Sequence, residues 1–214
     1  MPTACLDLNG VILGTNAALH ALACEESGLD IPAETFAGKE SVGRKFPLKK
    51  DNCRRGVLLA KHWEAAKYRF FEHPDDFVAN AALVPGVRRA AQILVSRGWE
   101  VAIVSDVKRL NEDLLRRWLR EQKFPNTDAS RILTRGEEPK TPWQSCCDVV
   151  VDNELEQLMP LAKKGGPRLV HFLPDRKSVG GERKMQTSMT PRITSVRGWE
   201  EALPFILQFE EALA

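Results

Sequence analysis

The second half of this chain alternates short, continuous apolar segments with segments of helical character. The apolar segments are residues 99–104, 132–133, 148–151, 168–173 and 193–196, and the helical segments are residues 85–97, 110–122, 154–163 and 199–214. Strands that are apolar on both faces are typical of a parallel sheet covered by helices on both sides. We therefore predict an α/β fold with a Rossmann-like, three-layer core and a central parallel sheet.

The first half has a different pattern. Residues 4–8 form an apolar segment that stops at the turn Asn9-Gly10, as a buried first strand does. Two helical segments follow, at residues 16–27 and 53–71, before the strand and helix alternation begins. This order predicts a discontinuous core of residues 1–13 and 81–214, with a small helical cap of residues 14–80 inserted after the first strand.

Composition excludes several classes of protein. The 214 residues carry 31 basic and 29 acidic side chains, and this balance argues against a nucleic-acid or membrane partner. No apolar segment approaches the roughly 18 residues that span a bilayer, and the N-terminus does not resemble a signal peptide. The five cysteines form no C-x-x-C pair, so we expect reduced thiols in a cytoplasmic protein. The oligomeric state is left open.

Three of the predicted strands end in, or are followed directly by, polar side chains. They are Asp7, the pair Ser105-Asp106 and the pair Asp152-Asn153. In open parallel sheets, ligands bind beyond the carboxyl ends of the strands. Carboxylates from two strands can bind one hard cation such as Mg²⁺, and a carboxylate can also be a covalent nucleophile. A serine hydroxyl and the cation of Lys140, which precedes the third of these strands, suit a phosphoryl group.

The segments CLDLNGVILGTN, IVSD and VVVDN, together with Lys140, resemble the four ordered motifs of the haloacid dehalogenase (HAD) superfamily of phosphohydrolases. The resemblance covers the predicted core. It implies a Mg²⁺-dependent hydrolase that acts on a small phosphomonoester through an aspartyl-phosphate. The segments KTPWQSCCDVVVDN and GWEEAL also resemble the cytosolic deoxyribonucleotidase branch of this superfamily.

Roles for individual residues follow from the resemblance. Asp7 would be the nucleophile, and Ser105 and Lys140 would bind the phosphoryl group. Asp7, Asp152 and the backbone carbonyl of Asn9 would ligate Mg²⁺. Gly10 permits a tight turn that directs backbone amides at a phosphate. The resemblance further suggests Asn153 and Glu156 as outer contacts of the metal.

Three features of the sequence have competing interpretations. Arg135 is an alternative to Lys140 as the phosphate-binding cation. Asp106 is a candidate substrate contact or a solvated acid at the end of a strand. The basic cluster of the cap is a solvated face, a contact for an anionic substrate or the contact of a nucleic-acid-end phosphatase. It comprises Arg44, Lys45, Lys49, Lys50, Arg54 and Arg55.

Asn9 departs from the pattern of the family, which usually has Asp at this position. That Asp protonates the leaving group and later activates water, and an amide cannot exchange protons in this way near neutral pH. The backbone carbonyl can still ligate a metal. The resemblance therefore leaves three alternatives. The chain is a poorly active member, or a non-hydrolytic one that binds a phosphorylated ligand or partner without turnover; another acid replaces the missing Asp; or Asn9 is an engineered change.

Overall fold

The computed structural model describes residues 1–31, 53–105, 111–128, 130–134, 141–173 and 192–213. The chain divides into two compact units, one of Met1–Leu13 with Leu83–Ala214 and the other of Gly14–Ala82. We call the first the core unit and the second the helical unit. Within the described residues, no helix has the length and apolar character needed to cross a membrane.

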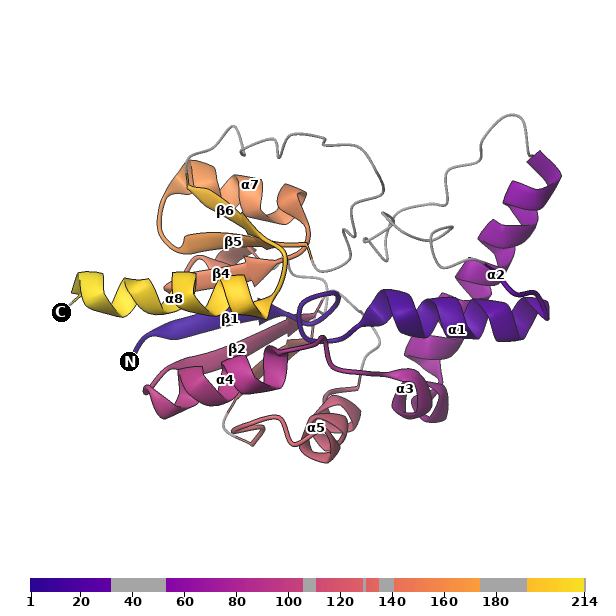
Figure 1. The fold of residues 1–214 in the computed structure, drawn as a ribbon, viewed down its shortest axis with the longest axis horizontal. Helices are drawn as coiled ribbons and strands as arrows, with labels where there is room; N and C mark the ends of the chain where they lie inside the picture. The colour runs from indigo at the N-terminus through magenta and orange to yellow at the C-terminus, as the bar shows by residue number, and fades with distance from the viewer. Residues whose placement is uncertain (32–52, 106–110, 129, 135–140, 174–191, 214) are drawn as a thin grey trace. The chain divides into compact units, whose positions relative to one another are not determined.

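The core unit is built on a six-stranded sheet in the order β3-β2-β1-β4-β5-β6 (Figure 1). Every neighbouring pair is parallel. The strands are β1 (Thr3–Asp7), β2 (Glu100–Ser105), β3 (Arg131–Thr134), β4 (Val149–Asp152), β5 (Arg168–Phe172) and β6 (Ile193–Val196). This parallel sheet confirms the predicted α/β, Rossmann-like fold. It places β1 between β2 and β4, at the centre of the sheet.

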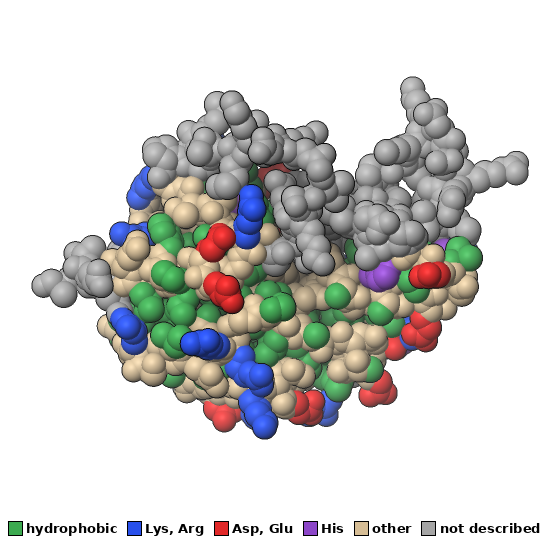
Figure 2. All heavy atoms as spheres, viewed as in Figure 1, with side chains coloured by type: hydrophobic (Ala, Val, Ile, Leu, Met, Phe, Trp, Pro, Cys, Tyr) green, Lys and Arg blue, Asp and Glu red, His purple; other side chains and the backbone are tan. Residues whose placement is uncertain are grey.

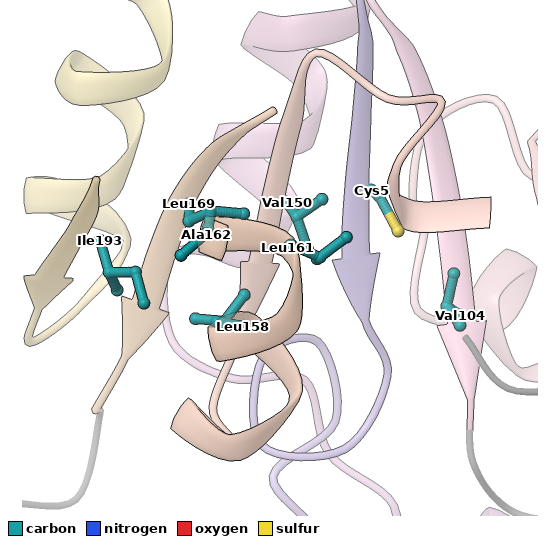
Figure 3. Packing of buried hydrophobic residues seen from close by; sticks show 8 residues of the cluster. All are labelled: Cys5, Val104, Val150, Leu158, Leu161, Ala162, Leu169 and Ile193. Carbon is teal, nitrogen blue, oxygen red and sulfur yellow. The ribbon is translucent and has the colours of Figure 1, made fainter. Parts of the chain in front are cut away.

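Helices cover the sheet. They are α4 (Val87–Ser96), α5 (Glu112–Glu121), α6 (Thr141–Gln144), α7 (Leu155–Lys164) and α8 (Trp199–Leu213). Figure 3 shows Leu158 and Leu161 of α7 packed over Val150 of β4 and Leu169 of β5, in one buried cluster with Cys5. Successive strand residues alternate between faces, so Phe172, which packs on Trp199 of α8 at a ring-centroid distance of 5.4 Å, lies on the other face.

Two details differ from the sequence-based expectations. The short helices α6 and α3 (Pro74–Asn80) were not predicted. Helix α5 begins after Asn111, whose side chain accepts hydrogen bonds from the amides of Asp113 and Leu114, and it buries Leu115 with Trp118 and Leu119. The spacing of Leu110, Leu114, Trp118 and Leu119 predicts one apolar face for this helix. In the structure Leu115 is buried in place of Leu114, and Leu110 lies outside the described residues. Residues 175–191, whose polar sequence with Gly180-Gly181 predicts a loop, lie outside the described residues.

The helical unit consists of α1 (Thr15–Ser27), α2 (Cys53–Glu72) and α3. Its buried side chains include Leu19 and Leu22 of α1, Phe70 of α2 and Phe77 of α3, and the rings of Phe70 and Phe77 lie 5.2 Å apart. Arg69 of α2 joins the three helices on the surface: its guanidinium forms ion pairs with Glu25, Glu26 and Asp76. Figure 2 shows basic and acidic side chains interspersed with apolar ones on the visible part of the described surface.

Candidate active site

The two central acids lie at the carboxyl ends of neighbouring strands. Strand β1 ends at Asp7 and β4 ends at Asp152. The last hydrogen-bonded pair of β1 and β4 joins Leu6 to Val151, so Asp7 and Asp152 occupy the next matched position. Neighbouring strands are about 4.8 Å apart, and side chains at matched positions point to the same face. Both acids are buried, at 3% and 0% exposure. Two ionised carboxylates this close in a buried setting repel each other, and a cation between them relieves the repulsion.

Hydrogen bonds from two directions hold the Asp152 carboxylate. Its Oδ1 accepts a hydrogen bond of 2.8 Å from the backbone amide of Glu154, just after β4. Its Oδ2 accepts one of 3.3 Å from Nε2 of Gln144, the last residue of α6. The carboxylate plane is therefore fixed by the chain on both sides of β4. A metal ligand needs this kind of fixed orientation.

The loop after β1 turns sharply and is tied down at several points. Gly10 has a φ of +80°, in the left-handed region, and its amide donates to the carbonyl of Leu13 at 2.8 Å. The indole of Trp199, from α8, donates to the carbonyl of Val11 at 3.0 Å in a buried contact. The loop that carries Asn9 is thus held by its own backbone and by the C-terminal helix.

The loops that follow β1 and β4 contact each other at Gly10. A Cβ on Gly10 would collide with the side-chain amide of Asn153, the residue after β4. Asn153 is itself buried, at 8% exposure. The absence of a side chain on Gly10 is therefore what allows the loops after β1 and β4 to approach each other.

Ser105 lies on the opposite side of β1 from Asp152. It is the last residue of β2, is buried, and pairs in register with Thr134 of β3. The amide of Leu8 donates to the carbonyl of Val104 at 2.8 Å, which joins the ends of β1 and β2. The sheet therefore brings Ser105, Asp7 and Asp152 to one edge from three neighbouring strands.

The structure describes only some of the remaining predicted site residues. Asn9 is buried in the loop after β1, and Glu156 is exposed in the first turn of α7. Lys140, its competitor Arg135 and Asp106 lie outside the described residues. The side chains of the basic cluster, residues 44–55, lie outside them as well.

A metal site here would depend on backbone oxygen. Among the described residues, no group of three His, Cys, Asp or Glu side chains is placed to hold a metal ion. Asp7 and Asp152 supply two carboxylates, and the Asn9 carbonyl is the third predicted ligand. All three are hard oxygen donors of the kind that Mg²⁺ binds, so the donor set fits this ion.

Two residues near Asp152, Gln144 and His171, were not predicted as site residues. Gln144 belongs to a four-residue helix, too short to show a periodic pattern. His171 pairs in register with Asp152, and its Nδ1 lies 3.4 Å from Oγ of Ser195. Residues 168–173 were predicted as a strand, but the register that aligns His171 with Asp152 is not visible in the sequence.

The Cys5 thiol, two residues before Asp7, is not a competing nucleophile. Its pKa is raised well above the usual value, first by a hydrogen bond with Cys147, then by burial, and further by the negative charges of Asp152 and Asp7. Since the thiolate is the reactive form of cysteine, the raised pKa and the burial of Cys5 both disfavour reaction at its thiol. Within the described residues, Cys5, Cys24, Cys146 and Cys147 form no disulfide bond.

No family model and no curated protein matches this chain. In contrast, 65 chains of solved structures are similar to it. A HAD-superfamily hydrolase from Ehrlichia chaffeensis has 14% identity and a TM-score of 0.53, and covers 97% of this chain and 98% of its own. A HAD family hydrolase from Deinococcus radiodurans R1, with bound phosphate and sodium, has 15% identity and a TM-score of 0.56, with coverages of 97% and 96%.

A third similar structure is a predicted phosphoglycolate phosphatase from Haemophilus somnus 129PT. Its identity is 15% and its TM-score 0.56, and the similarity covers 96% of this chain and 98% of that one. Sequence identities this low establish the shared fold and nothing finer. The chain therefore has the fold of the HAD-superfamily hydrolases over nearly its whole length.

Proposed function

We propose that this protein is a Mg²⁺-dependent phosphohydrolase of the HAD type that acts on a small phosphomonoester. The observation that carries the proposal is the matched position of Asp7 and Asp152 at the carboxyl ends of β1 and β4. Ser105 is the last residue of β2, one position beyond Val104, the register partner of Asp7. The fold supports it as well, since one similar structure contains phosphate and sodium.

In this proposal, a carboxylate oxygen of Asp7 attacks phosphorus. A bond forms between that oxygen and phosphorus, the ester P–O bond breaks, and the leaving oxygen keeps the electron pair. Water then attacks the aspartyl-phosphate, which releases phosphate and restores Asp7. The Ser105 hydroxyl donates a hydrogen bond to a phosphoryl oxygen, and Lys140 neutralises its charge. Bound Mg²⁺, held by Asp7, Asp152 and the Asn9 carbonyl, supplies charge neutralisation on the phosphoryl group.

The helical unit is proposed as a cap. It is inserted between Leu13 and Leu83, directly after the loop that follows β1. A cap inserted at this point of the sequence would select the substrate, as closing lids do in other enzymes.

A phosphoenzyme assay tests the central step. The purified protein is incubated with Mg²⁺ and a panel of phosphomonoesters, quenched in acid, and analysed by mass spectrometry of its peptides. We expect one phosphoryl group on the peptide that contains Asp7 and none in the Asp7→Asn variant. Equal turnover by both proteins would exclude Asp7 as the nucleophile.

A second candidate function is favoured by Asn9 alone: a HAD-fold protein that binds a phosphorylated ligand or partner without turnover. The Asn9→Asp variant separates the two. If this variant gains no activity while phosphate binding persists, the protein is a binding module. If the unmodified protein already turns over in the panel, this second function is excluded.

A further inference from the structure

Gln144 has one half of its side-chain amide engaged and the other half buried without a partner. Nε2 donates to Oδ2 of Asp152 at 3.3 Å. Oε1 is fully shielded from solvent and has no hydrogen-bond partner among the described residues. Gln144 as a whole is 1% exposed.

The orientation of this amide is fixed by its neighbour. Rotation of the amide by half a turn would bring Oε1 against the Asp152 carboxylate, where two acceptors repel each other. Because the carboxylate selects the N–H end, the carbonyl end must be directed elsewhere. A buried acceptor without a donor is costly, so native proteins rarely retain one unless a ligand or water completes it.

We propose that Gln144 is a positioning residue of the cation site: its N–H group orients Asp152, and its Oε1 accepts a hydrogen bond from a water molecule bound to the cation. This inference rests on the Mg²⁺ site of the proposed function. Mg²⁺ in proteins usually keeps several waters, and water on a divalent cation is a strong hydrogen-bond donor. The first role uses the bond to Asp152, and the second satisfies the orphaned oxygen.

Glutamine suits these two roles better than its isosteres do. Glutamate at this position would set a second carboxylate against Asp152, and methionine would supply neither the donor nor the acceptor. Groups that orient metal ligands from outside typically change metal affinity by about 10- to 100-fold when they are removed.

The experiment measures binding of Mg²⁺ alone to the full chain by isothermal titration calorimetry. We expect the Gln144→Met variant to bind Mg²⁺ about 10- to 100-fold more weakly than the unmodified protein. A matched control is Gln92→Met, which makes the same change at an exposed position of α4 and leaves affinity unchanged. Equal Mg²⁺ affinity of the Gln144→Met variant and the unmodified protein overturns the inference and leaves the proposed function standing.

A second variant keeps the test decisive if Gln144→Met does not fold. Gln144→Glu preserves the shape of the side chain and places like charges together. We expect Mg²⁺ to raise its Tm by more than it raises that of the unmodified protein, because the cation relieves the added repulsion. An equal rise in both proteins overturns the inference. If the unmodified protein neither binds Mg²⁺ nor gains Tm, the proposed metal site fails, and the inference fails with it.

Discussion

The side-chain amide of Asn153 lies directly against the Cα of Gly10, so the loops that follow β1 and β4 contact each other at the carboxyl edge of the sheet. Gly10 has a φ of +80°, which side chains disfavour, and Asn153 is buried. Two separate constraints, backbone conformation and space, therefore require glycine at position 10. They can be separated experimentally.

The Gly10→Ala variant tests both constraints together. A non-glycine residue in the left-handed region costs about 1–2 kcal/mol, and forcing atoms into packed space adds to this, so we expect a loss of about 2–3 kcal/mol in the free energy of unfolding. Urea denaturation measures this loss.

Gly98→Ala is the matched control for the Gly10 variant. Gly98 has a φ of +81°, but a Cβ there would meet nothing within 4 Å. We expect it to lose only about 1 kcal/mol, from the backbone strain alone. Combining Gly10→Ala with Asn153→Ala should recover part of the loss. If Gly10→Ala and Gly98→Ala lose the same free energy, the contact with Asn153 contributes nothing.

The indole of Trp199 anchors the same loop from the other end of the sequence. Replacing it by Phe keeps most of the ring but removes the donor to the Val11 carbonyl. A buried carbonyl without its donor costs about 1–3 kcal/mol. We therefore expect Trp199→Phe to lower the free energy of unfolding, measured by urea denaturation, by about 2 kcal/mol. Hydrogen exchange should also speed up in residues 8–13. The exposed Trp143 provides the control substitution, Trp143→Phe, and a similar loss there would show that the Val11 bond is unimportant.

The ion pairs of Arg69 predict how stability of the helical unit depends on pH. The hydrogen bond from Arg69 lowers the pKa of Asp76. A carboxyl group whose pKa is lower in the folded state stabilises the fold above its unfolded pKa of about 3.9, and this stabilisation is lost as the pH falls through the lower, folded pKa. We expect Arg69→Met to lose about 1 kcal/mol at pH 7.

The free energy of unfolding measured at acid pH provides the control for this prediction. The free-energy difference between Arg69→Met and the unmodified protein should shrink as the pH falls below about 4, because protonated Asp76 no longer pairs with Arg69. Arg69→Lys keeps the charge but loses the planar fork that reaches Glu26 and Asp76 together, so it should lie between the two. A difference that is constant with pH would show that the loss comes from packing and not from charge.

The sheet was predictable from sequence because its signals are local. Continuous apolar segments predicted all six strands to within about one residue at each end. Gly28, which ends α1 with a φ of +64°, marked the end of that helix in the sequence. Helix α3 also carries a start signal, Pro74 followed by two acids, but it has only seven residues. Helix α6 has only four residues and leaves no periodic trace.

The contacts that shape the candidate site were not predictable, because they join residues that are distant in sequence. Trp199 and Val11 are 188 residues apart, and the contact of Gly10 with Asn153 depends on the parallel pairing of β1 with β4. Gln144 lies only eight residues before Asp152, yet nothing in its local sequence indicates that it is buried or that it bonds to that acid. Strand order and register set these relationships, and hydrophobic periodicity determines neither of them.

Asn9 predicts a steep dependence of activity on the leaving group. Since an amide cannot protonate the departing oxygen, esters whose leaving group is stable as an anion, such as aryl phosphates, should be hydrolysed much faster than alkyl phosphates. Asn9→Asp should raise kcat/KM for alkyl phosphates by about 10²–10⁴-fold and for aryl phosphates far less. Steady-state kinetics with a series of phosphomonoesters of graded leaving-group pKa measures, for each protein, the slope of log kcat/KM against that pKa. Asn9→Ser, which retains the backbone carbonyl but adds no acid, is the control. Equal slopes for the unmodified protein and Asn9→Asp would mean that proton transfer comes from another residue.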